Sequence, residues 1–403
     1  MNTFQINKSV EASESLSIEY YNKKMFRESI NQNLLTLDLL EYRHPDVLKN
    51  SAICHYNLCE IDKSLELFQE YMDITKSKDK TDIRQYAQYL TRLGRYDEGY
   101  EYIKNNQIEC EDKHLDIGWF LHRKGKFKEA FIETEIGRNG AFWTNEKLPP
   151  PNVDRWFGYQ NIKGSKICVI GEAGLGDEMI FSRWIPMLKD MGAFVYYYTD
   201  NSLKNVISRN FKVFPVDPTI KYDYWVPSMS LPFNLKVEKP GNEKYLEPNP
   251  VYLAKWKQKL KMYDNLIALN WTGDKEHSEN DLRTIPIEYL IDKIKHQGTL
   301  ISVCMGAETC PEGVIDLTKD IKDWDDTLAI LSLCKMCYTS SSSVSVAAGA
   351  LGIKTYLYDI VVGYFTWCAA ENGGKSDWFP DVTVWRQQKM GDWISVIDKS
   401  LNY

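Results

Sequence analysis

One stretch near the middle of the chain decides the fold of its larger part: Lys166-Ile-Cys-Val-Ile-Gly-Glu-Ala-Gly-Leu-Gly-Asp177. Its first five residues form a short apolar run that is typical of a buried parallel strand. A glycine-rich turn comes next, and apolar residues at helical spacing then predict a helix over residues 178–191. A strand, a tight turn and a helix in this order open a parallel α/β unit.

The same alternation continues towards the end of the chain. Apolar and β-branched runs predict further strands at residues 194–198, 266–270, 299–303, 336–339 and 355–358. Alternating strands and helices favour open parallel sheets with right-handed crossovers, and the chain is long enough for two of them. Ligands of such sheets bind at the carboxyl ends of the strands, so we expect a site between the two halves.

Residues 1–140 have a different composition, rich in Leu, Tyr, Glu and Lys, with Pro45 as their one proline. Four similar stretches begin at Lys24, Cys59, Gly94 and Gly125, at intervals of 35, 35 and 31 residues, each between two amphipathic segments. The pattern resembles tetratricopeptide repeats, helix pairs that recur about every 34 residues. A generic helical bundle is the alternative. Residues 141–151 end in three prolines, which indicate a linker.

The overall composition argues against several classes of protein. A formal net charge of −7 disfavours a nucleic-acid binder. The sequence contains no apolar run of the roughly 20 residues that a membrane span needs, and its N-terminus lacks the apolar core of a signal peptide. The nine cysteines have no framework spacing, and Cys334-Lys-Met-Cys337 has no second pair at zinc spacing. We therefore expect reduced thiols, no metal and a cytoplasmic location, in the host cytoplasm if the chain is viral.

The glycine-rich turn is the first candidate for a functional site. Gly174 and Gly176 would let a ligand approach backbone amides at the start of a helix. The spacing is neither that of a dinucleotide-binding turn nor that of a Walker loop. Asp177 has two interpretations, since its carboxylate could take a proton from a substrate hydroxyl or cap the helix.

Two further loops come after predicted strands. The loop after Asn270 contains Arg283, whose planar guanidinium suits phosphate oxygens, although a solvated charged loop is the alternative. The turn Thr339-Ser-Ser-Ser-Ser343 offers hydroxyls and amides that suit a diphosphate, or it forms a helix cap and a flexible turn. The aromatic residues of the C-terminal tail are more typical of a core or an interface than of a sugar-binding platform.

Taken together, these loops resemble a known family. Gly171–Trp184, Asn270-Trp-Thr-Gly273, Arg283-Thr-Ile-Pro286 and Ala348–Gly352 occur in the order found in bacterial and phage tetratricopeptide proteins with a glycosyltransferase domain. The resemblance covers about residues 150–403, a part similar to the heptosyltransferases of the GT-B fold. It implies a tetratricopeptide-like helical solenoid (1–140), a linker (141–151) and a GT-B-type pair of Rossmann-like α/β halves, the acceptor side at 152–255 and the donor side at 256–403.

The resemblance also implies roles for individual residues. Asp177 matches the aspartate that acts as general base in the heptosyltransferases, and Arg283 falls near the basic residue that binds the donor diphosphate. The family commonly has Asp-Thr-Ser in the hydroxyl turn and His shortly after it, whereas this chain has Ser341-Ser-Ser343 and Val346. The full set of expected donor-binding residues is Gly174, Gly176, Asn270, Thr272, Gly273, Arg283, Ser341, Ser342 and Ser343.

The function implied is that of an inverting, metal-independent glycosyltransferase. It would move a sugar from a nucleotide-diphosphate donor to the hydroxyl of a saccharide, a protein or a modified nucleobase, without a cofactor. The repeats would recruit the acceptor or a protein partner. The alternative is a catalytically inactive tetratricopeptide scaffold with a degenerate GT-B domain.

Overall fold

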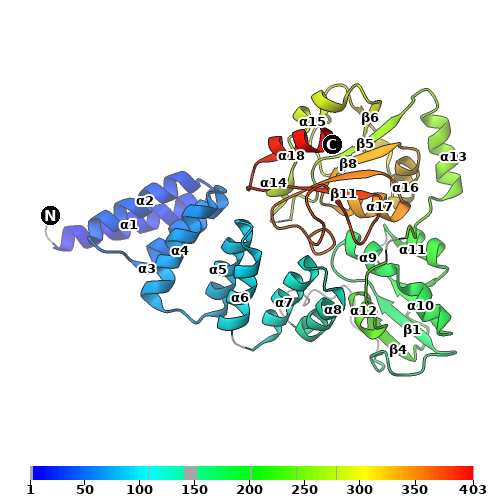
Figure 1. Cartoon of the computed structure of the whole chain (residues 1–403), viewed down its shortest axis with the longest axis horizontal. Helices are drawn as coiled ribbons and strands as arrows, with labels where there is room; N and C mark the ends of the chain where they lie inside the picture. Colours follow the sequence, from blue (N-terminus) through cyan, green and yellow to red (C-terminus); the bar gives the residue numbers. More distant parts are fainter. Residues whose placement is uncertain are drawn as a thin grey trace. The chain divides into compact units, whose positions relative to one another are not determined.

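The computed structural model describes residues 3–107, 109–139, 152–199, 202–241, 243–277 and 279–402 (Figure 1). Contacts divide the chain into two compact units, one of Met1–Glu109 with Gln388–Gly391 and the other of Cys110–Gln387 with Asp392–Tyr403. The linker predicted at residues 141–151 lies outside the described residues. The boundaries at 140 and 255 stay predictions, and the contacts group residues 110–139 with the α/β part of the chain.

The first unit consists of antiparallel helical hairpins that stack on one another. The helices pair as α1 with α2, α3 with α4 and α5 with α6, while α2 packs on α3 and α4 packs on α5. Their bounds are α1 (Thr3–Asn22), α2 (Phe26–Leu40), α3 (Pro45–Asn57), α4 (Ile61–Thr75), α5 (Lys80–Arg92) and α6 (Tyr96–Asn106). Recurring hairpins of this length are the tetratricopeptide-like repeats expected from the sequence.

The turn inside each hairpin explains the sequence repeat. The residues that begin the repeated stretches have a left-handed backbone, with φ of 59°, 60°, 76° and 66° at Lys24, Cys59, Gly94 and Gly125. In all four turns, the next amide bonds to the carbonyl five residues before it, at 2.9–3.0 Å. This is a Schellman-type helix end, for which glycine is the residue of lowest strain. The two repeats with glycine are therefore the two that stand out most clearly in the sequence.

The fourth hairpin belongs to the second unit. It consists of α7 (Glu111–Arg123) and α8 (Phe127–Ile136), continued by the 3₁₀ helix η1 (Gly137–Asn139). Gly118 lets the two helices approach, because a Cβ there would lie 2.8 Å from the side chain of Thr134. α8 also packs on α12 (Leu231–Asn234) of the first α/β half, so this hairpin is attached to the α/β region directly.

The first sheet is parallel throughout, with the strand order β3-β2-β1-β4. Its strands are β1 (Lys166–Ile170), β2 (Phe194–Tyr198), β3 (Phe214–Pro215) and β4 (Tyr224–Pro227). Its helices are α9 (Leu175–Ser182), α10 (Ile185–Asp190), α11 (Lys204–Phe211) and α12, with the 3₁₀ helix η3 (Ser228–Ser230). Strands β1 and β2 coincide with the two strands predicted for this half.

The predicted helix at 178–191 differs from the observed one in two ways. It begins earlier, at Leu175, and it is broken into α9 and α10 at Arg183 and Trp184. Pro186 stands in the first turn of α10. A proline there removes an amide donor and clashes with the preceding turn, which favours the observed break before it.

The second sheet has the order β10-β11-β9-β8-β5-β6-β7, in which the β10–β11 pair is antiparallel and the other pairs are parallel. Its strands are β5 (Leu266–Asn270), β6 (Thr299–Ser302), β7 (Ile315–Asp316), β8 (Met336–Ser340), β9 (Thr355–Asp359), β10 (Gly374–Lys375) and β11 (Val382–Arg386). Its helices are α13 (Pro250–Lys259), α14 (Asn280–Arg283), α15 (Ile287–Ile294), α16 (Trp324–Ser332), α17 (Ser343–Leu351) and α18 (Trp393–Leu401), with η4 (Thr318–Asp320). Helical hairpin repeats and two parallel α/β halves after them confirm the predicted fold class.

One hydrophobic core runs through the fourth hairpin and both α/β halves. Buried aromatic rings with centroids 5.3–6.4 Å apart connect these parts, and they come from α7, α8, α9, the junction of α9 with α10 and the segment between β9 and β11: His122, Phe127, Phe131, Phe181, Trp184, Phe365 and Trp378. Arg183 adds a cation over the Trp378 ring, at 5.3 Å, and donates to the Trp378 carbonyl at 3.2 Å. The halves are therefore joined by packing as well as by the chain.

Buried ion pairs attach the end of the fourth hairpin to the first half. Arg138 forms a two-pronged pair with Glu172 in the turn after β1, at 2.6 and 3.0 Å. Arg138 also bonds Glu135 at 3.3 Å, and Glu135 in turn contacts Arg155 and Ser230. Burial alone would lower the pKa of Arg138, but the two carboxylates raise it, so the guanidinium stays charged.

We expect Arg138→Met to lower the free energy of unfolding of the second unit by about 3 kcal/mol, because Glu172 would be left as a buried, unpaired charge. Lys259→Met is the control, because Lys259 and Asp320 form an exposed pair worth about 0–1 kcal/mol. All twelve tryptophans lie after residue 110, so tryptophan fluorescence during urea unfolding reports on this unit. Equal losses in the two variants would contradict the structural role of the pair.

His122 should make the second unit sensitive to acid. Burial among aromatic rings lowers its pKa from 6.5 to about 3, so the folded state binds one proton fewer than the unfolded state between these values. The stability that neutral His122 contributes is therefore fully present above about pH 6.5, and it is lost as the pH falls towards 3. His122→Leu should flatten this decrease between pH 6 and 4, measured by the same urea titration. A slope equal to that of the parent would show that His122 is not buried in its neutral form.

Candidate functional site

The three loops predicted from the sequence lie at the carboxyl ends of β1, β5 and β8. The loops after β1 and β8 meet where α9 packs on α17 (Figure 1). A Cβ added to Gly176 would lie 3.5 Å from Ser343 Cα and 3.5 Å from Val346 Cγ2, so this position leaves space for no more than a methyl group. Gly176 therefore lies where the starts of two helices, one from each half, are in contact.

The glycine-rich turn is shaped differently from what its glycines suggest. The left-handed residue is Ala173, with φ of 56°, while neither Gly174 nor Gly176 has a positive φ. Gly171 is required by space instead, because a Cβ there would lie 2.8 Å from both Glu178 Oε2 and the Tyr198 carbonyl. Because Ala173 carries a side chain, its left-handed backbone stores strain of roughly 1 kcal/mol in the turn that carries Asp177.

Asp177 is held from both sides. Its Oδ2 accepts a hydrogen bond from the Gly174 amide at 3.1 Å, which is a helix-capping bond, and its Oδ1 accepts one from the Tyr364 hydroxyl at 2.7 Å. Asp177 is 8% exposed. The structure thus contains the helix-capping bond that one interpretation of Asp177 predicts. The same carboxylate also bonds Tyr364 of the second half. Glu172, the other acid of this turn, is engaged by Arg138 and by the Met229 amide at 3.0 Å.

The loop after β5 is a hydrogen-bonded network around Asn280. The Asn280 side chain accepts from the Gly273 amide at 2.9 Å and donates to Thr272 Oγ1 at 2.9 Å. Thr272 and Thr284 share a hydroxyl–hydroxyl bond of 2.8 Å. The short helix α14 is thereby fixed to the end of the strand, and its last residue is Arg283.

Arg283 is a half-buried cation. Its Nε donates to Asn280 Oδ1 at 3.3 Å, and its guanidinium lies against Gly273, where a Cβ would be 2.7 Å from Nη2. Within the described ranges Arg283 forms no ion pair, and burial lowers its pKa while the charge of Asp274 raises it. A guanidinium in such surroundings gains from an anionic ligand.

Asn270 connects this loop to the serine turn. Its amide donates to Ser342 Oγ at 3.0 Å and to Thr339 Oγ1 at 3.2 Å. Ser342 is the N-cap of α17, where the Ser345 hydroxyl accepts from its amide at 3.2 Å. Ser341 and Ser343 are partly exposed, and the hydroxyl of Ser340 is buried without a hydrogen-bond partner among the described residues. The hydroxyls and backbone amides at the start of α17 can donate hydrogen bonds to an anion.

Two residues of this region were not predicted from the sequence. Tyr364 stands in an aromatic segment that reads as core, and only the fold brings its hydroxyl to Asp177. Asn280 lies in a polar stretch, where a buried amide cannot be told from a solvated one. The predicted Cys334 and Cys337 thiols are both buried and unbridged, and burial raises the pKa of Cys334 to about 12.

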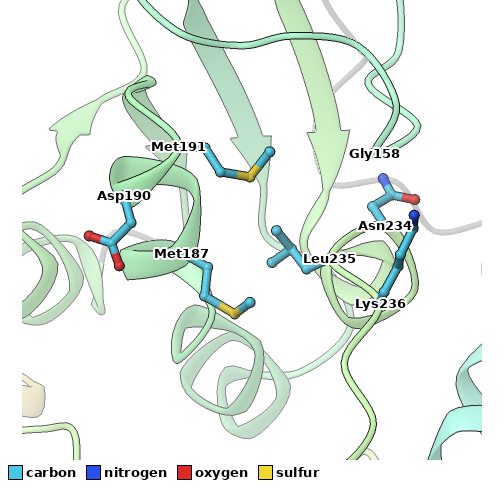
Figure 2. A pocket seen from close by; sticks show the side chains of 7 residues that line it. All are labelled: Gly158, Met187, Asp190, Met191, Asn234, Leu235 and Lys236. Atoms are coloured by element: carbon cyan, nitrogen blue, oxygen red, sulfur yellow. The ribbon is translucent and has the colours of Figure 1, made fainter.

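A separate hollow lies on the first half, away from these loops. Its volume is about 430 Å³. Figure 2 shows the side chains that line it, among them Met187 and Asp190 of α10 and Met191 directly after that helix. The other lining residues are Gly158, Asn234, Leu235 and Lys236. None of the residues predicted for the site belongs to this lining.

Neither a clustered metal site nor a membrane-spanning helix is found in the described part of the chain. Across these residues, His, Cys, Asp and Glu form no group of three that could hold a metal ion. In the same ranges, no helix combines the length and the apolar character needed to cross a membrane.

Comparisons with known proteins gave distant likenesses. No protein-family model matches the chain. Protein FlbA of Caulobacter vibrioides is 23% identical over 323 residues, which are 66% of this chain and 52% of FlbA, so the chain spans about half the length of this curated relative. Among the solved structures that are similar to the chain are a glycosyl transferase family 9 protein from Veillonella parvula (12% identity, 57% and 88% of the two chains, TM-score 0.43) and the E. coli ADP-heptose lipopolysaccharide heptosyltransferase II (11%, 59% and 98%, TM-score 0.41).

Proposed function

We propose that the chain is an inverting glycosyltransferase that uses a nucleotide-diphosphate sugar and needs no metal. One observation carries the proposal: an acid, a half-buried cation and a hydroxyl turn stand on three strand ends joined by direct contacts. Gly176, next to Asp177, packs on Ser343, and Asn270 bonds Ser342 beside the network that holds Arg283. Strand ends of two facing α/β halves are where a donor and an acceptor can meet.

The donor diphosphate would bind the second half. Arg283 can give its phosphate oxygens two parallel hydrogen bonds, because the guanidinium is not engaged by a carboxylate in the described residues. The first-turn amides of α17 and the hydroxyls of Ser341, Ser342 and Ser343 would bind the other phosphate oxygens. Gly273 keeps the backbone open beside the guanidinium, and Asn270 and Thr272 fix the two loops.

The transfer would be a direct displacement at the anomeric carbon. Asp177 would take the proton of the acceptor hydroxyl, whose oxygen forms the new bond to the sugar. The bond between that carbon and the diphosphate oxygen breaks, and its electron pair leaves with the nucleoside diphosphate. Arg283 and the start of α17 would stabilise the charge that develops on the leaving group, which is the task a metal ion performs elsewhere. The helical hairpins would recruit the acceptor or a protein partner.

Arg283→Ala should weaken binding of the nucleoside diphosphate by about 1.5–3 kcal/mol, the range of hydrogen bonds to charged groups. Isothermal titration calorimetry measures the affinity. Lys275→Ala is the control from the same loop, because Lys275 is paired with Glu308 on the surface. An unchanged affinity in Arg283→Ala, with the fold intact, would remove Arg283 from the donor site.

Asp177→Asn should lower turnover by roughly 10²–10⁴-fold, the usual loss when a general base is removed. The carbonyl oxygen of asparagine can still accept from the Gly174 amide, so the melting temperature should be close to that of the parent. Donor affinity should also be unchanged. A variant within a few-fold of the parent in turnover would eliminate Asp177 as the base and leave it as a cap.

A specific observation also supports the alternative of an inactive scaffold. Both oxygens of Asp177 accept hydrogen bonds from within the protein, and the starts of α9 and α17 are in contact. Val346 occupies part of that contact, at the position where the resembling family has His. A panel of nucleoside diphosphates in a thermal-shift assay separates the two functions, because selective stabilisation by one of them requires a retained donor site.

A further inference from the structure

The hydrogen bond between Tyr364 and Asp177 joins the two α/β halves at the proposed base. Tyr364 lies in the segment after β9, while Asp177 lies in the first turn of α9. The hydroxyl stands 2.7 Å from Asp177 Oδ1. Burial and the neighbouring carboxylate raise the pKa of Tyr364 well above its usual value, so the phenol keeps its proton and is the donor.

The backbone of Tyr364 is fixed by a buried ion pair. Asp359 at the end of β9 and Arg386 at the end of β11 lie 3.4 Å apart, and Arg386 also donates to the carbonyls of Trp367 and Ala370 at 2.6 and 2.9 Å. The backbone at Gly363 lies close to this pair, because a Cβ at that position would be only 2.1 Å from Asp359 Oδ2. The residue after this close approach is Tyr364.

The ring of Tyr364 is fixed from two other directions. Trp119 of α7 meets it edge-on, with centroids 5.3 Å apart and planes at 80°. Phe365 lies 4.5 Å away, within the aromatic core. The hydroxyl is thus aimed at Asp177 by contacts from the fourth hairpin, from the core and from the second sheet.

We propose that Tyr364 is a positioning residue for Asp177 in the proposed transfer, aiming the carboxylate through its Oδ1. An ionised carboxylate offers about four acceptor sites, and the bonds from Gly174 and Tyr364 fix the orientation of its plane. The inference rests on the proposed function, because it assigns Tyr364 through the role of Asp177. It also makes Trp119, from the helical part of the chain, a support of the reacting group.

Tyr364→Phe removes the hydroxyl and keeps the ring packed against Trp119 and Phe365. Turnover should fall about 10- to 100-fold, as expected for a lost hydrogen bond to a charged group. The acid limb of the pH–kcat profile should move to higher pH, because the hydroxyl stabilises the charged carboxylate. Donor affinity and melting temperature should be unchanged. Tyr159→Phe is the matched control, because Tyr159 is 81% exposed.

The surrounding charges are the same in parent and variant. In the turn and α9 they are Glu172, paired with Arg138, and Glu178, bonded to Thr199. Helix α17 carries no titratable side chain. Near Trp119, helix α7 carries Asp116, His122, which burial keeps neutral, and Arg123, whose charge acts on Asp359. A moved acid limb therefore reports the loss of the Tyr364 hydroxyl.

Combining the two substitutions separates a failure of this inference from a failure of the proposed function. If Asp177→Asn keeps its turnover, the proposed base itself is wrong. If Asp177→Asn loses turnover while Tyr364→Phe keeps both turnover and acid limb, only the inference is overturned. In the Asp177→Asn background, Tyr364→Phe should cost less than about twofold, since the two residues act through one bond.

A readout without turnover is the carboxyl ¹³C signal of Asp177, labelled in aspartate and assigned by its loss in Asp177→Asn. Its titration midpoint should rise in Tyr364→Phe by about one pH unit or more. An unchanged midpoint overturns the inference. Increased turnover in Tyr364→Phe also overturns it, because the hydroxyl would then obstruct the acceptor.

Discussion

The contact between the starts of α9 and α17 is the constraint on which the rest of the second unit depends. At Gly176 the start of α9 lies beside Ser343 and Val346 of the other half, with room for a methyl group between them. A residue larger than alanine at position 176 would separate the two helix starts and, with them, the carboxyl ends of β1 and β8. The aromatic core and Arg183 hold the halves together behind this contact.

The fourth helical hairpin is part of this arrangement. Arg138 engages the turn after β1 through Glu172, and Trp119 packs on Tyr364, which bonds Asp177. A hairpin that resembles its predecessors in sequence thus contributes to the surroundings of the candidate site. This gives a physical reason for a repeat region and an α/β pair to occur in one chain: the last repeat supports both loops that hold the proposed base.

Features set by local sequence pattern could be predicted, whereas features set by tertiary contact mostly could not. Apolar runs located β1, β2, β5, β6, β8 and β9, and the left-handed turns made the repeats visible. The break between α9 and α10 was missed, although Pro186 signals it, because helical spacing continues on both sides. The glycine-rich turn was located correctly, yet its left-handed residue is Ala173, which no composition rule suggests. Tyr364 could not be found, since it lies 187 residues from Asp177 in the chain.

We propose that a nucleoside diphosphate binds the second half at Arg283 and the serine turn. The most direct measurement is a crystal structure of the full chain soaked with ADP, GDP, UDP or CDP, whichever raises the melting temperature most. We expect phosphate oxygens within hydrogen-bond distance of the Arg283 guanidinium and of the amides at Ser343 and Val344. A nucleotide bound elsewhere, for example in the hollow beside Met187, or no binding at millimolar concentration, would contradict it.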